Sequence, residues 1–321
     1  MIVLNAISLN ATSDVPPAAR GGAYAIGNFD GVHRGHQVLL QAAREHAAAV
    51  GGPAGVILFE PHPRELFQPD IPHFRLTPLA RKLELLEGLG LDVAVVLKFD
   101  AALAALSAQD FIARILVDAL GARHIIIGYD FRFGQGRGGD AETLRRAGRA
   151  HGFGVSVVAP VGEGDTVFSS GVVRAALTRG DVAGAARLLG RFWRVLGEVI
   201  GGFKRGTGLG FPTANIALTP GAALAHGIYA VRVYAEGHAF AGAAYLGTRP
   251  TFDDGVPMLE VFLLDFDGDL YGKVITLEFL DFVRADMKFT SIDALKAQIA
   301  QDCSKAQAIV EAARATPLGE G

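Results

Sequence analysis

Apolar runs and helical patterns alternate along roughly the first 180 residues of the chain. Short apolar runs that predict strands lie at Ala23–Ile26, Gly55–Phe59, Val93–Phe99, His124–Ile127 and Val155–Ala159. Patterns of helical period lie between them, at His33–Val50, Pro78–Leu89, Ser107–Leu120 and Asp140–Ala150. This alternation predicts an α/β, Rossmann-like parallel sheet with helices on both faces, in which ligands bind beyond the carboxyl ends of the strands.

The pattern changes at about Trp193, where strand-like segments begin to follow one another directly. They lie at Trp193–Ile200, Tyr229–Tyr234, Phe240–Leu246, Leu259–Asp265 and Val274–Phe282. A helical pattern returns only near the end, with Ile292, Leu295 and Ile299 on one face. Consecutive strands predict an antiparallel β-barrel or sandwich with a terminal helix. We therefore expect two domains, residues 1–186 and 187–321.

Composition narrows the class of protein. A length of 321 residues favours two domains, and a net charge of −3 argues against a general nucleic-acid surface. The chain contains no apolar run of the roughly 18 residues that a membrane span needs. Its single cysteine, Cys303, excludes an internal disulfide and is expected to pack with Leu295 and Ile299 on a helix face. These features predict a cytoplasmic protein that binds neither nucleic acid nor membranes.

The stretch Gly27–His36, with the sequence GNFDGVHRGH, lies between a predicted strand and a helical run. Glycines let a backbone approach a ligand closely, and a helix N-terminus offers unpaired N–H groups and the positive end of a dipole. His33 and His36, three residues apart, are placed to point at one phosphate. The alternative is a tight turn with one capping histidine and one buried histidine.

Three further segments would complete a nucleotide site. Phe59–Pro63 (FEPHP) ends a predicted strand in a corner made rigid by two prolines. Gly128–Gly134 (GYDFRFG) offers aromatic faces for a flat flavin or adenine, with a loop packed on its own phenylalanines as the alternative. Phe168–Arg174 (FSSGVVR) begins a helix with two hydroxyls and an arginine that suits two phosphate oxygens.

The second half carries its own candidate chemistry. Gly202–Asn215 (GFKRGTGLGFPTAN) combines a glycine-rich, positively charged loop with two short oxygen-bearing side chains. Thr213 and Asn215 offer the hard oxygen ligands that Mg²⁺ takes, while a solvated β-hairpin is the alternative. Glu260 is an isolated acid in an apolar strand, where a carboxylate is costly unless it is paired or functional.

Taken in order, these segments resemble the motifs of a known enzyme family. The first resembles the HxGH signature of the adenylyl- and cytidylyltransferase superfamily, and the next three resemble the FxPHP, GxDFxFGxxRxG and SSTxxR motifs of one branch of it. The fuller GNFDGVHxGH form is similar to its riboflavin branch, the bacterial bifunctional riboflavin kinase/FMN adenylyltransferases. GFPTAN is the hallmark of riboflavin kinases, and later segments also resemble that family at Gly247–Phe252, Leu259–Phe266, Leu270–Gly272 and Arg284–Phe289.

The chain departs from the family pattern at two places. Gly171 stands where the SSTxxR motif has threonine, so a hydroxyl contact is missing there. Tyr245 and Leu246 stand where Asn-Ile is common. We expect the first departure to cause a modest loss of activity, because both serines and Arg174 remain.

The resemblance implies a role for each of the following residues. Those implied as catalytic are His33, His36, Arg174 and Glu260, the last as a general base. Those implied to bind ATP in the adenylyltransferase half are Gly27, Asn28, Phe29, Asp130, Ser169 and Ser170. Those implied to lie at the flavin are Pro61, His62, Pro63 and Arg284. Those implied to bind ATP in the kinase half are Lys204, Gly206, Gly208, Gly210, Thr213 and Asn215, with Thr213 and Asn215 also holding Mg²⁺.

The implied function is a two-step synthesis of FAD. The C-terminal domain would phosphorylate riboflavin with ATP to give FMN, and the N-terminal domain would adenylylate FMN with a second ATP to give FAD and pyrophosphate. One alternative is a monofunctional riboflavin kinase with a decayed first half, of which Gly171 is the hint. Another is a regulator that binds flavin without catalysis.

Overall fold

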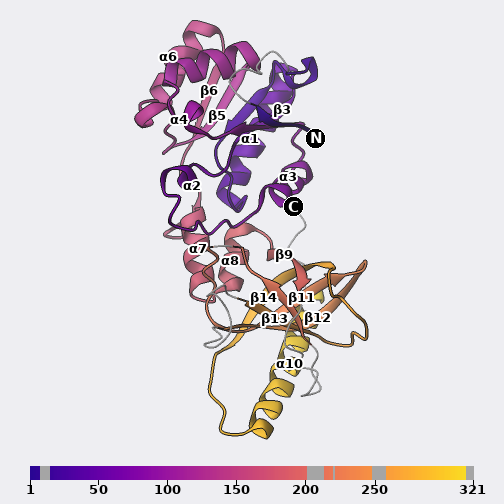
Figure 1. Ribbon diagram of the computed structural model, residues 1–321. Coiled ribbons are helices and arrows are strands. Elements are labelled where there is room, and N and C mark those ends of the chain that lie inside the picture. The colour runs from indigo at the N-terminus through magenta and orange to yellow at the C-terminus, as the bar shows by residue number, and fades with distance from the viewer. Residues whose placement is uncertain (8–14, 201–212, 220, 248–257, 316–321) are drawn as a thin grey trace. The chain divides into compact units, whose positions relative to one another are not determined.

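The computed structural model describes residues 1–7, 15–200, 213–219, 221–247 and 258–315 (Figure 1). The chain divides into two compact units, Met1–Ser170 and Gly171–Gly321. The predicted domain boundary between residues 186 and 187 falls inside helix α8 (Val182–Leu189), which packs against two strands of the second unit. That boundary remains a prediction about where the two activities separate.

The first unit is built on a parallel sheet of six strands in the order β1-β4-β3-β2-β5-β6. The strands are β1 (Ile2–Ile7), β2 (Ala23–Ile26), β3 (Ala54–Glu60), β4 (Val93–Lys98), β5 (His124–Gly128) and β6 (Gly154–Val158). The predicted parallel sheet is confirmed, and the five strands expected from apolar runs all form. The edge strand β1 was missed because Ile2 and Val3 are more than a third exposed, so it lacks a continuous buried run.

Helices cover both faces of this sheet, as predicted. They are η2 (Pro17–Ala19), α1 (Arg34–Val50), α2 (Pro63–Phe67), α3 (Leu79–Gly88), α4 (Ala101–Ala104), α5 (Ala108–Phe111), η3 (Ile112–Ala119), η4 (Gln135–Arg137) and α6 (Ala141–His151). A short hairpin, β7 (Gly162–Glu163) and β8 (Thr166–Val167), follows the sheet. The helix predicted over Ser107–Leu120 forms as α5 followed by the wider π-helical turns of η3.

Two apolar cores lie on opposite faces of the sheet because successive side chains of a strand alternate in direction. On β4, Val95 belongs to the core that includes Ile115 of η3 and Leu144 of α6. Its neighbour Val96 belongs to the other core, which includes Leu40 of α1 and other fully buried residues. The near-continuous apolar runs read from the sequence are therefore the consequence of burial on both faces.

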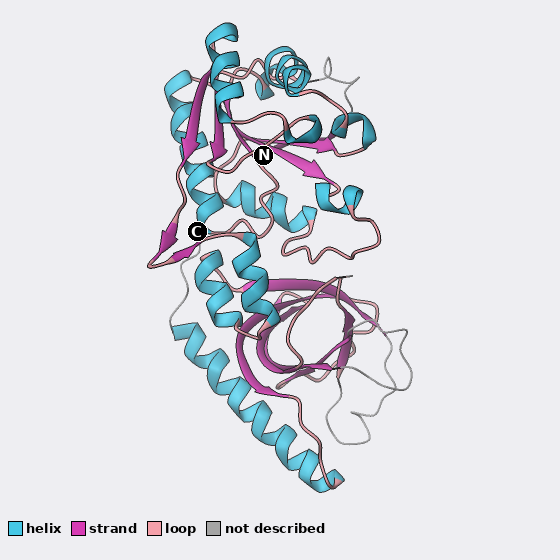
Figure 2. Cartoon of the chain, turned by 90° about the vertical axis from the view of Figure 1, so that its left-hand side faces the viewer, coloured by secondary structure: helices cyan, strands magenta, loops and turns pink. Residues whose placement is uncertain are grey.

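The second unit is a closed antiparallel barrel of six strands in the order β10-β13-β12-β11-β14-β9, seen nearly end-on in Figure 2. The strands are β9 (Trp193–Ile200), β10 (Ala214–Ala217), β11 (Gly227–Ala235), β12 (His238–Gly247), β13 (Met258–Leu263) and β14 (Val274–Ala285). Its helices are α7 (Ser170–Thr178), α8 and α10 (Ile292–Ala315). The predicted barrel and terminal helix are confirmed, and β10 is the strand that the glycine- and proline-rich pattern concealed.

Helix α10 packs on the outer wall of the barrel. Cys303 and Ala306 lie in one apolar cluster with Ala230 of β11 and Ala243 of β12. Cys303 is 8% exposed, and burial raises the pKa of its thiol to about 11. The expected packing role of this cysteine is confirmed.

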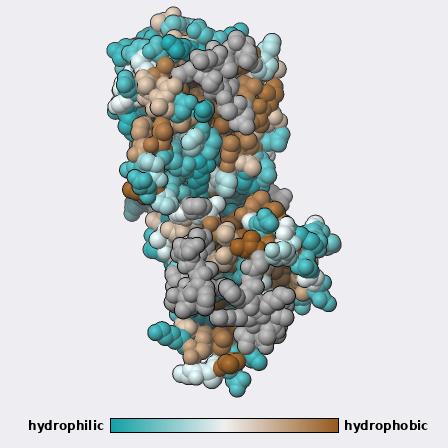
Figure 3. Space-filling model, in the orientation of Figure 1, coloured by the Kyte–Doolittle hydropathy of each residue, from teal (hydrophilic) through white to brown (hydrophobic). Residues whose placement is uncertain are grey.

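The surface is mixed in polarity. On the face seen in Figure 3, hydrophilic residues cover much of the first unit, and apolar residues lie in separate patches. No helix within the described ranges is long and apolar enough to cross a bilayer.

A histidine pair lies between α1 and the sheet. His46 and His124 stack with ring centroids 3.6 Å apart, and the Ser156 hydroxyl lies 2.9 Å from Nε2 of His124 and 3.0 Å from Nε2 of His46. Burial, and to a lesser extent His46, lowers the pKa of His124 to about 4. The folded state therefore keeps His124 neutral at pH values at which an unfolded chain would protonate it.

We predict that this pair makes the folded chain acid-sensitive. Between about pH 6.5 and pH 4 the unfolded state binds a proton at His124 that the folded state excludes, so stability falls as the pH is lowered through that window. In His124→Gln the fall in melting temperature between pH 7 and pH 5, followed by circular dichroism, should be smaller than in the parent chain. His151→Gln, a change at an exposed histidine of α6, should retain the parent's pH dependence. An equal fall in all three proteins would contradict the prediction.

Candidate functional site

The turn between β2 and α1 lies at the carboxyl end of the sheet, where parallel α/β sheets bind ligands. Two of its non-glycine residues have positive φ angles, Phe29 at 47° and Val32 at 42°, and both side chains are fully buried. A positive φ in a non-glycine residue is unfavourable by about 1–3 kcal/mol. The conformation persists only where surrounding contacts fix the backbone. The turn is therefore held in its shape by its neighbours.

His33 and His36 lie together at the start of α1. Their rings stack with centroids 3.6 Å apart, and His33 is 5% exposed. His33 is the N-cap of α1, where its Nδ1 accepts the backbone N–H of His36 at 3.3 Å. Accepting through Nδ1 leaves the proton of a neutral ring on Nε2, which is then a hydrogen-bond donor. The capping role is confirmed and fixes the donor atom, and the phosphate role remains a prediction.

Gly35 is needed for this stacking. A Cβ at residue 35 would lie 3.1 Å from Nδ1 of His33 and 3.1 Å from the carbonyl oxygen of Phe168. Any larger residue would push the His33 ring or the 168–170 segment away. The glycine of the HRGH pattern thus serves close packing around the histidine pair.

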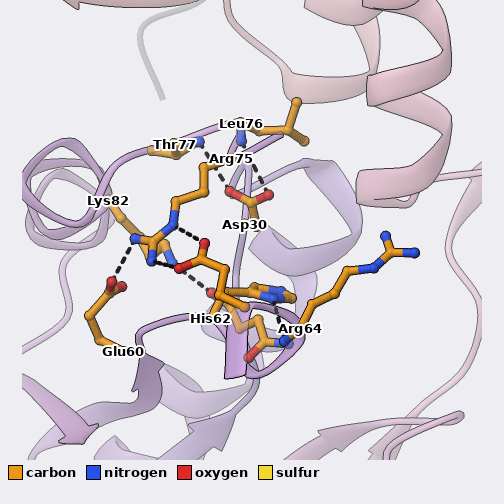
Figure 4. A network of polar contacts seen from close by, with 10 residues as sticks. Asp30, Glu60, His62, Arg64, Arg75, Leu76, Thr77 and Lys82 are labelled. Atoms are coloured by element: carbon orange, nitrogen blue, oxygen red, sulfur yellow. Dashed lines mark hydrogen bonds and ion pairs between the residues drawn. The ribbon is translucent and has the colours of Figure 1, made fainter. Parts of the chain in front are cut away.

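Contacts from elsewhere in the first unit hold the turn (Figure 4). The buried carboxylate of Asp30 accepts the backbone N–H groups of Leu76 at 3.2 Å and Thr77 at 3.0 Å. The Nζ of Lys82, on α3, donates to the carbonyl oxygen of Asn28 at 2.9 Å. Burial lowers the pKa of Lys82, although the charges of Asp30 and Glu60 oppose this effect.

Asn28 has a side-chain atom suited to a ligand. Its Oδ1 is buried and accepts no hydrogen bond from the residues that the structure describes. Leaving a buried acceptor unsatisfied costs about 1–3 kcal/mol, a cost that a bound N–H donor would remove. This observation supports the prediction that Asn28 lies in a nucleotide pocket.

The Pro61–Pro63 corner leads from β3 into the short helix α2. His62 caps this helix, with its Nδ1 accepting the backbone N–H of Arg64 at 3.2 Å, and its ring stacks on His73 with centroids 4.3 Å apart. Phe67, at the end of α2, is 66% exposed and meets Phe99 edge-to-face. The corner therefore presents aromatic faces at the carboxyl edge of the sheet.

Arg75 ties this corner together. Its guanidinium donates to Glu65 through Nε and Nη2 and to Glu60 through Nη1, each at 2.5 Å. Its hydrogen bonds lower the pKa of Glu65. The same contacts with Glu65 raise the pKa of Arg75 itself. Three charged side chains from β3, α2 and the following segment thus form one network.

The loop after β5 separates into a packed part and an exposed part. Phe131 and Phe133 stack with centroids 5.6 Å apart, and both pack against the core, as the structural alternative predicted. Tyr129 is 55% exposed and Asp130 is also exposed. The ATP-binding role of Asp130 remains a prediction.

Ser170, the first residue of α7, and Ser169 before it lie close to the turn. The Ser170 hydroxyl donates to the carbonyl oxygen of Asp30 at 2.7 Å, so one face of the serine motif fastens the turn. Ser169 is half-buried next to it. Arg174 follows Ser170 by four residues, which places both on the same face of α7. Their phosphate contacts remain predictions.

Strand register brings two predicted kinase residues together. Asn215 of β10 pairs directly with Glu260 of β13, and Tyr245 of β12 pairs with Glu260 from the other side. Directly opposed residues of antiparallel strands share one face, so these side chains form a row. Leu259 and Val261 are fully buried and flank Glu260, which therefore lies on the outer wall of the barrel.

Several kinase residues fall elsewhere. Lys204, Gly206, Gly208 and Gly210 lie outside the described residues, and Thr213 immediately precedes β10. Arg284, predicted at the flavin, donates from Nε to both carboxylate oxygens of Asp302 at 3.0 Å and from Nη2 to one of them at 2.7 Å. This pairing fastens α10 to the end of β14, and a flavin contact of Arg284 remains a prediction.

Two network residues, Lys82 and Arg75, were missed from the sequence. Lys82 stands in the apolar stripe of its helix, with Leu79, Leu83 and Leu86 at helical spacing. A lysine at the centre of an apolar stripe indicates that its ammonium group is buried with a specific partner. Arg75 gave no such signal, because its partners Glu60 and Glu65 approach only through the fold.

Comparison with known proteins agrees with this geometry. Residues 15–172 match the family model of FAD synthetase, and residues 189–310 match that of riboflavin kinase. The bifunctional riboflavin kinase/FMN adenylyltransferase of Pseudomonas fluorescens is 44% identical over 91% of this chain and 94% of its own length. The Escherichia coli K12 protein of the same name is 43% identical over 88% of this chain and 90% of its own length.

A solved structure has the same fold over most of its length. It is described as a macrolide-efflux protein from Streptococcus pneumoniae, and it superimposes with a TM-score of 0.84 at 29% identity, covering 96% of this chain and 99% of that one. Both family models match in the order that the motifs predict, and the relatives share the two-part organisation. The chain belongs to the family of bifunctional riboflavin kinase/FMN adenylyltransferases.

Proposed function

We propose that the chain synthesises FAD in two steps, using riboflavin, FMN and ATP as substrates. Residues 187–321 transfer the γ-phosphoryl group of ATP to riboflavin, and residues 1–186 transfer an adenylyl group from ATP to FMN with release of pyrophosphate. The main support is that folding brings motif residues together in each half. His33 stacks on His36 at the start of α1, and Asn215 lies beside Glu260 on the barrel wall. Because both steps consume ATP, we place the reaction in the cytoplasm.

Adenylyl transfer needs alignment and charge compensation more than it needs a base. The terminal phosphate of FMN is anionic and attacks the α-phosphorus of ATP without losing a proton. The Nε2–H of His33, the stacked His36 and the positive end of the α1 dipole compensate the developing charge. Asn28 Oδ1 accepts a hydrogen bond from the nucleotide, and the Pro61–Pro63 corner faces the flavin.

The kinase step needs a base because its nucleophile is a neutral hydroxyl of the ribityl chain. Glu260 is the candidate, as a half-buried carboxylate in the row with Asn215. When bound, Mg²⁺ would neutralise charge on the phosphate oxygens of ATP. The donors fit this ion, since Thr213 and Asn215 offer neutral oxygens beside the Glu260 carboxylate, and Mg²⁺ keeps water and phosphate oxygens as its other ligands.

One assay separates the proposed function from its two alternatives. The purified chain is incubated with Mg²⁺ and ATP, with either riboflavin or FMN, and the products are separated by chromatography. We expect FMN from riboflavin and FAD with pyrophosphate from FMN. A kinase with a decayed first half would form FMN but no FAD. A regulator would bind flavin and release neither ADP nor pyrophosphate.

We predict that His36→Ala abolishes most FAD synthesis and spares FMN synthesis. Loss of one preorganised donor to a phosphoryl group that gains charge typically lowers the rate by about 10²–10³-fold. Both rates are measured on the same preparation, and His151→Ala on the exposed end of α6 is the control. A normal rate of FAD formation would return the histidine pair to a purely structural role.

We predict the reverse pattern for Glu260→Gln. The amide keeps the shape of the side chain but cannot take the proton, so the kinase kcat should fall by roughly 10²–10⁴-fold with a much smaller change in the KM for ATP. FAD synthesis from supplied FMN should stay near normal. Glu198→Gln, at an exposed glutamate of β9, is the matched control and should leave both rates unchanged. Retention of kinase activity by Glu260→Gln would exclude the base.

A further inference from the structure

We propose that Asp30 and Lys82 form a brace that fixes the backbone of the turn between β2 and α1, and that Lys82 is thereby a positioning residue for adenylyl transfer. This inference rests on the adenylyltransferase activity proposed above. It concerns two residues to which the motif resemblance assigned no role. The name Asp30–Lys82 brace is used below for these two side chains and their contacts with Asn28, Leu76 and Thr77.

The turn has three points of attachment within three consecutive residues. Lys82 from α3 holds the carbonyl oxygen of Asn28 at 2.9 Å. The Asp30 carboxylate holds the N–H groups of Leu76 and Thr77, and the Asp30 carbonyl oxygen accepts the Ser170 hydroxyl. Each attachment comes from a different segment of the unit. Movement of Asn28 would break the contact with α3, and movement of Asp30 would break the contacts with the other two segments.

The attachments answer a need that the turn itself creates. Phe29 lies between the two braced residues and has a φ of 47°, and Val32 follows at 42°. Without external contacts, L-residues in these conformations would relax toward negative φ. Such a relaxation would change the direction of the Asn28 side chain and the start of α1, where His33 stands as the N-cap.

The position of Lys82 is costly, which argues for a specific role. Its side chain is 5% exposed, and among the described residues its hydrogen bond to Asn28 is the one that it makes. An ammonium group has three N–H donors, so one hydrogen bond does not compensate for the hydration that it loses on burial. Burial lowers the pKa of Lys82, and the charges of Asp30 and Glu60 oppose this effect without reversing it. An apolar residue would suit the stripe of α3 better if packing were the only requirement.

The brace also joins the two substrate sides of the site. Arg75 holds Glu60 and Glu65 at the flavin corner and directly precedes Leu76 and Thr77, whose N–H groups bind Asp30. Figure 4 shows the ion pairs of Arg75 beside the hydrogen bonds of Asp30, and the backbone from Arg75 to Thr77 links the two. The same short segment therefore positions the corner for flavin and the turn for ATP relative to each other.

Loss of the brace would affect catalysis through the alignment of the two substrates. In-line attack at the α-phosphorus depends on the distance between the two substrates, and a misplacement of about 1 Å typically costs on the order of 10²-fold in rate. Loss of the brace should therefore lower kcat more than it raises either KM. The kinase step, which the second unit carries out, should not respond.

The test compares Lys82→Met with Lys82→Arg and with the control Arg81→Met. Arg81 is a neighbouring half-buried cation paired with Glu84. For Lys82→Met we expect the kcat of FAD synthesis to fall by about 10–100-fold, with each KM within about threefold and FMN synthesis unchanged. Lys82→Arg keeps a charged donor and should recover a large part of the loss. Arg81→Met should match the parent chain.

Asp30→Asn tests the brace from its other side, and Lys82→Met/Asp30→Asn tests the coupling. We expect the same selective loss of kcat from Asp30→Asn, and a combined loss smaller than the product of the two single losses. Multiplicative losses, an unchanged kcat in either single variant, or equal loss of FAD and FMN synthesis in Lys82→Met would overturn the inference. Failure of the parent chain to form FAD would instead refute the proposed function on which it rests.

Discussion

The shape of the turn between β2 and α1 is the constraint on which the first unit's site depends. This turn brings the N-terminus of α1 and a histidine pair to the carboxyl edge of the sheet, and it does so through two buried residues of positive φ. That conformation is unfavourable locally and is imposed by contacts from α3, the 74–77 segment and the start of α7. The site is therefore a product of the whole unit rather than of its motif.

In the second unit, strand register rather than a strained turn brings the candidate site residues together. Register on neighbouring strands places Asn215, Glu260 and Tyr245 in one row, because opposed residues of an antiparallel pair share a face. Buried neighbours on each side of Glu260 fix which face it occupies. A one-residue slip would turn the carboxylate into the barrel interior, so the apolar alternation that stabilises β13 also specifies the site.

The sequence predicted those parts of the structure that local patterns specify. Five strands of the sheet and both domain types follow from apolar runs that burial on one or two faces produces, and the GNFDGVHRGH stretch marks where α1 and its histidines begin. The misses have different causes: β1 carries exposed Ile2 and Val3, and β10 is a strand of four residues that follows a glycine- and proline-rich segment. Arg284 has its partner Asp302 on a helix 18 residues away, a pairing that no spacing rule reveals.

The two halves differ in chemistry for a reason that lies in their nucleophiles. A phosphate needs no base, so the first unit concentrates donors and a helix N-terminus, and its acids Asp30, Glu60 and Glu65 are engaged in holding the site in shape. A hydroxyl must lose a proton, and the second unit places Glu260, the proposed base, beside Asn215. Because each device would serve the other reaction poorly, the division of the chain into two units follows from the chemistry of its two acceptors.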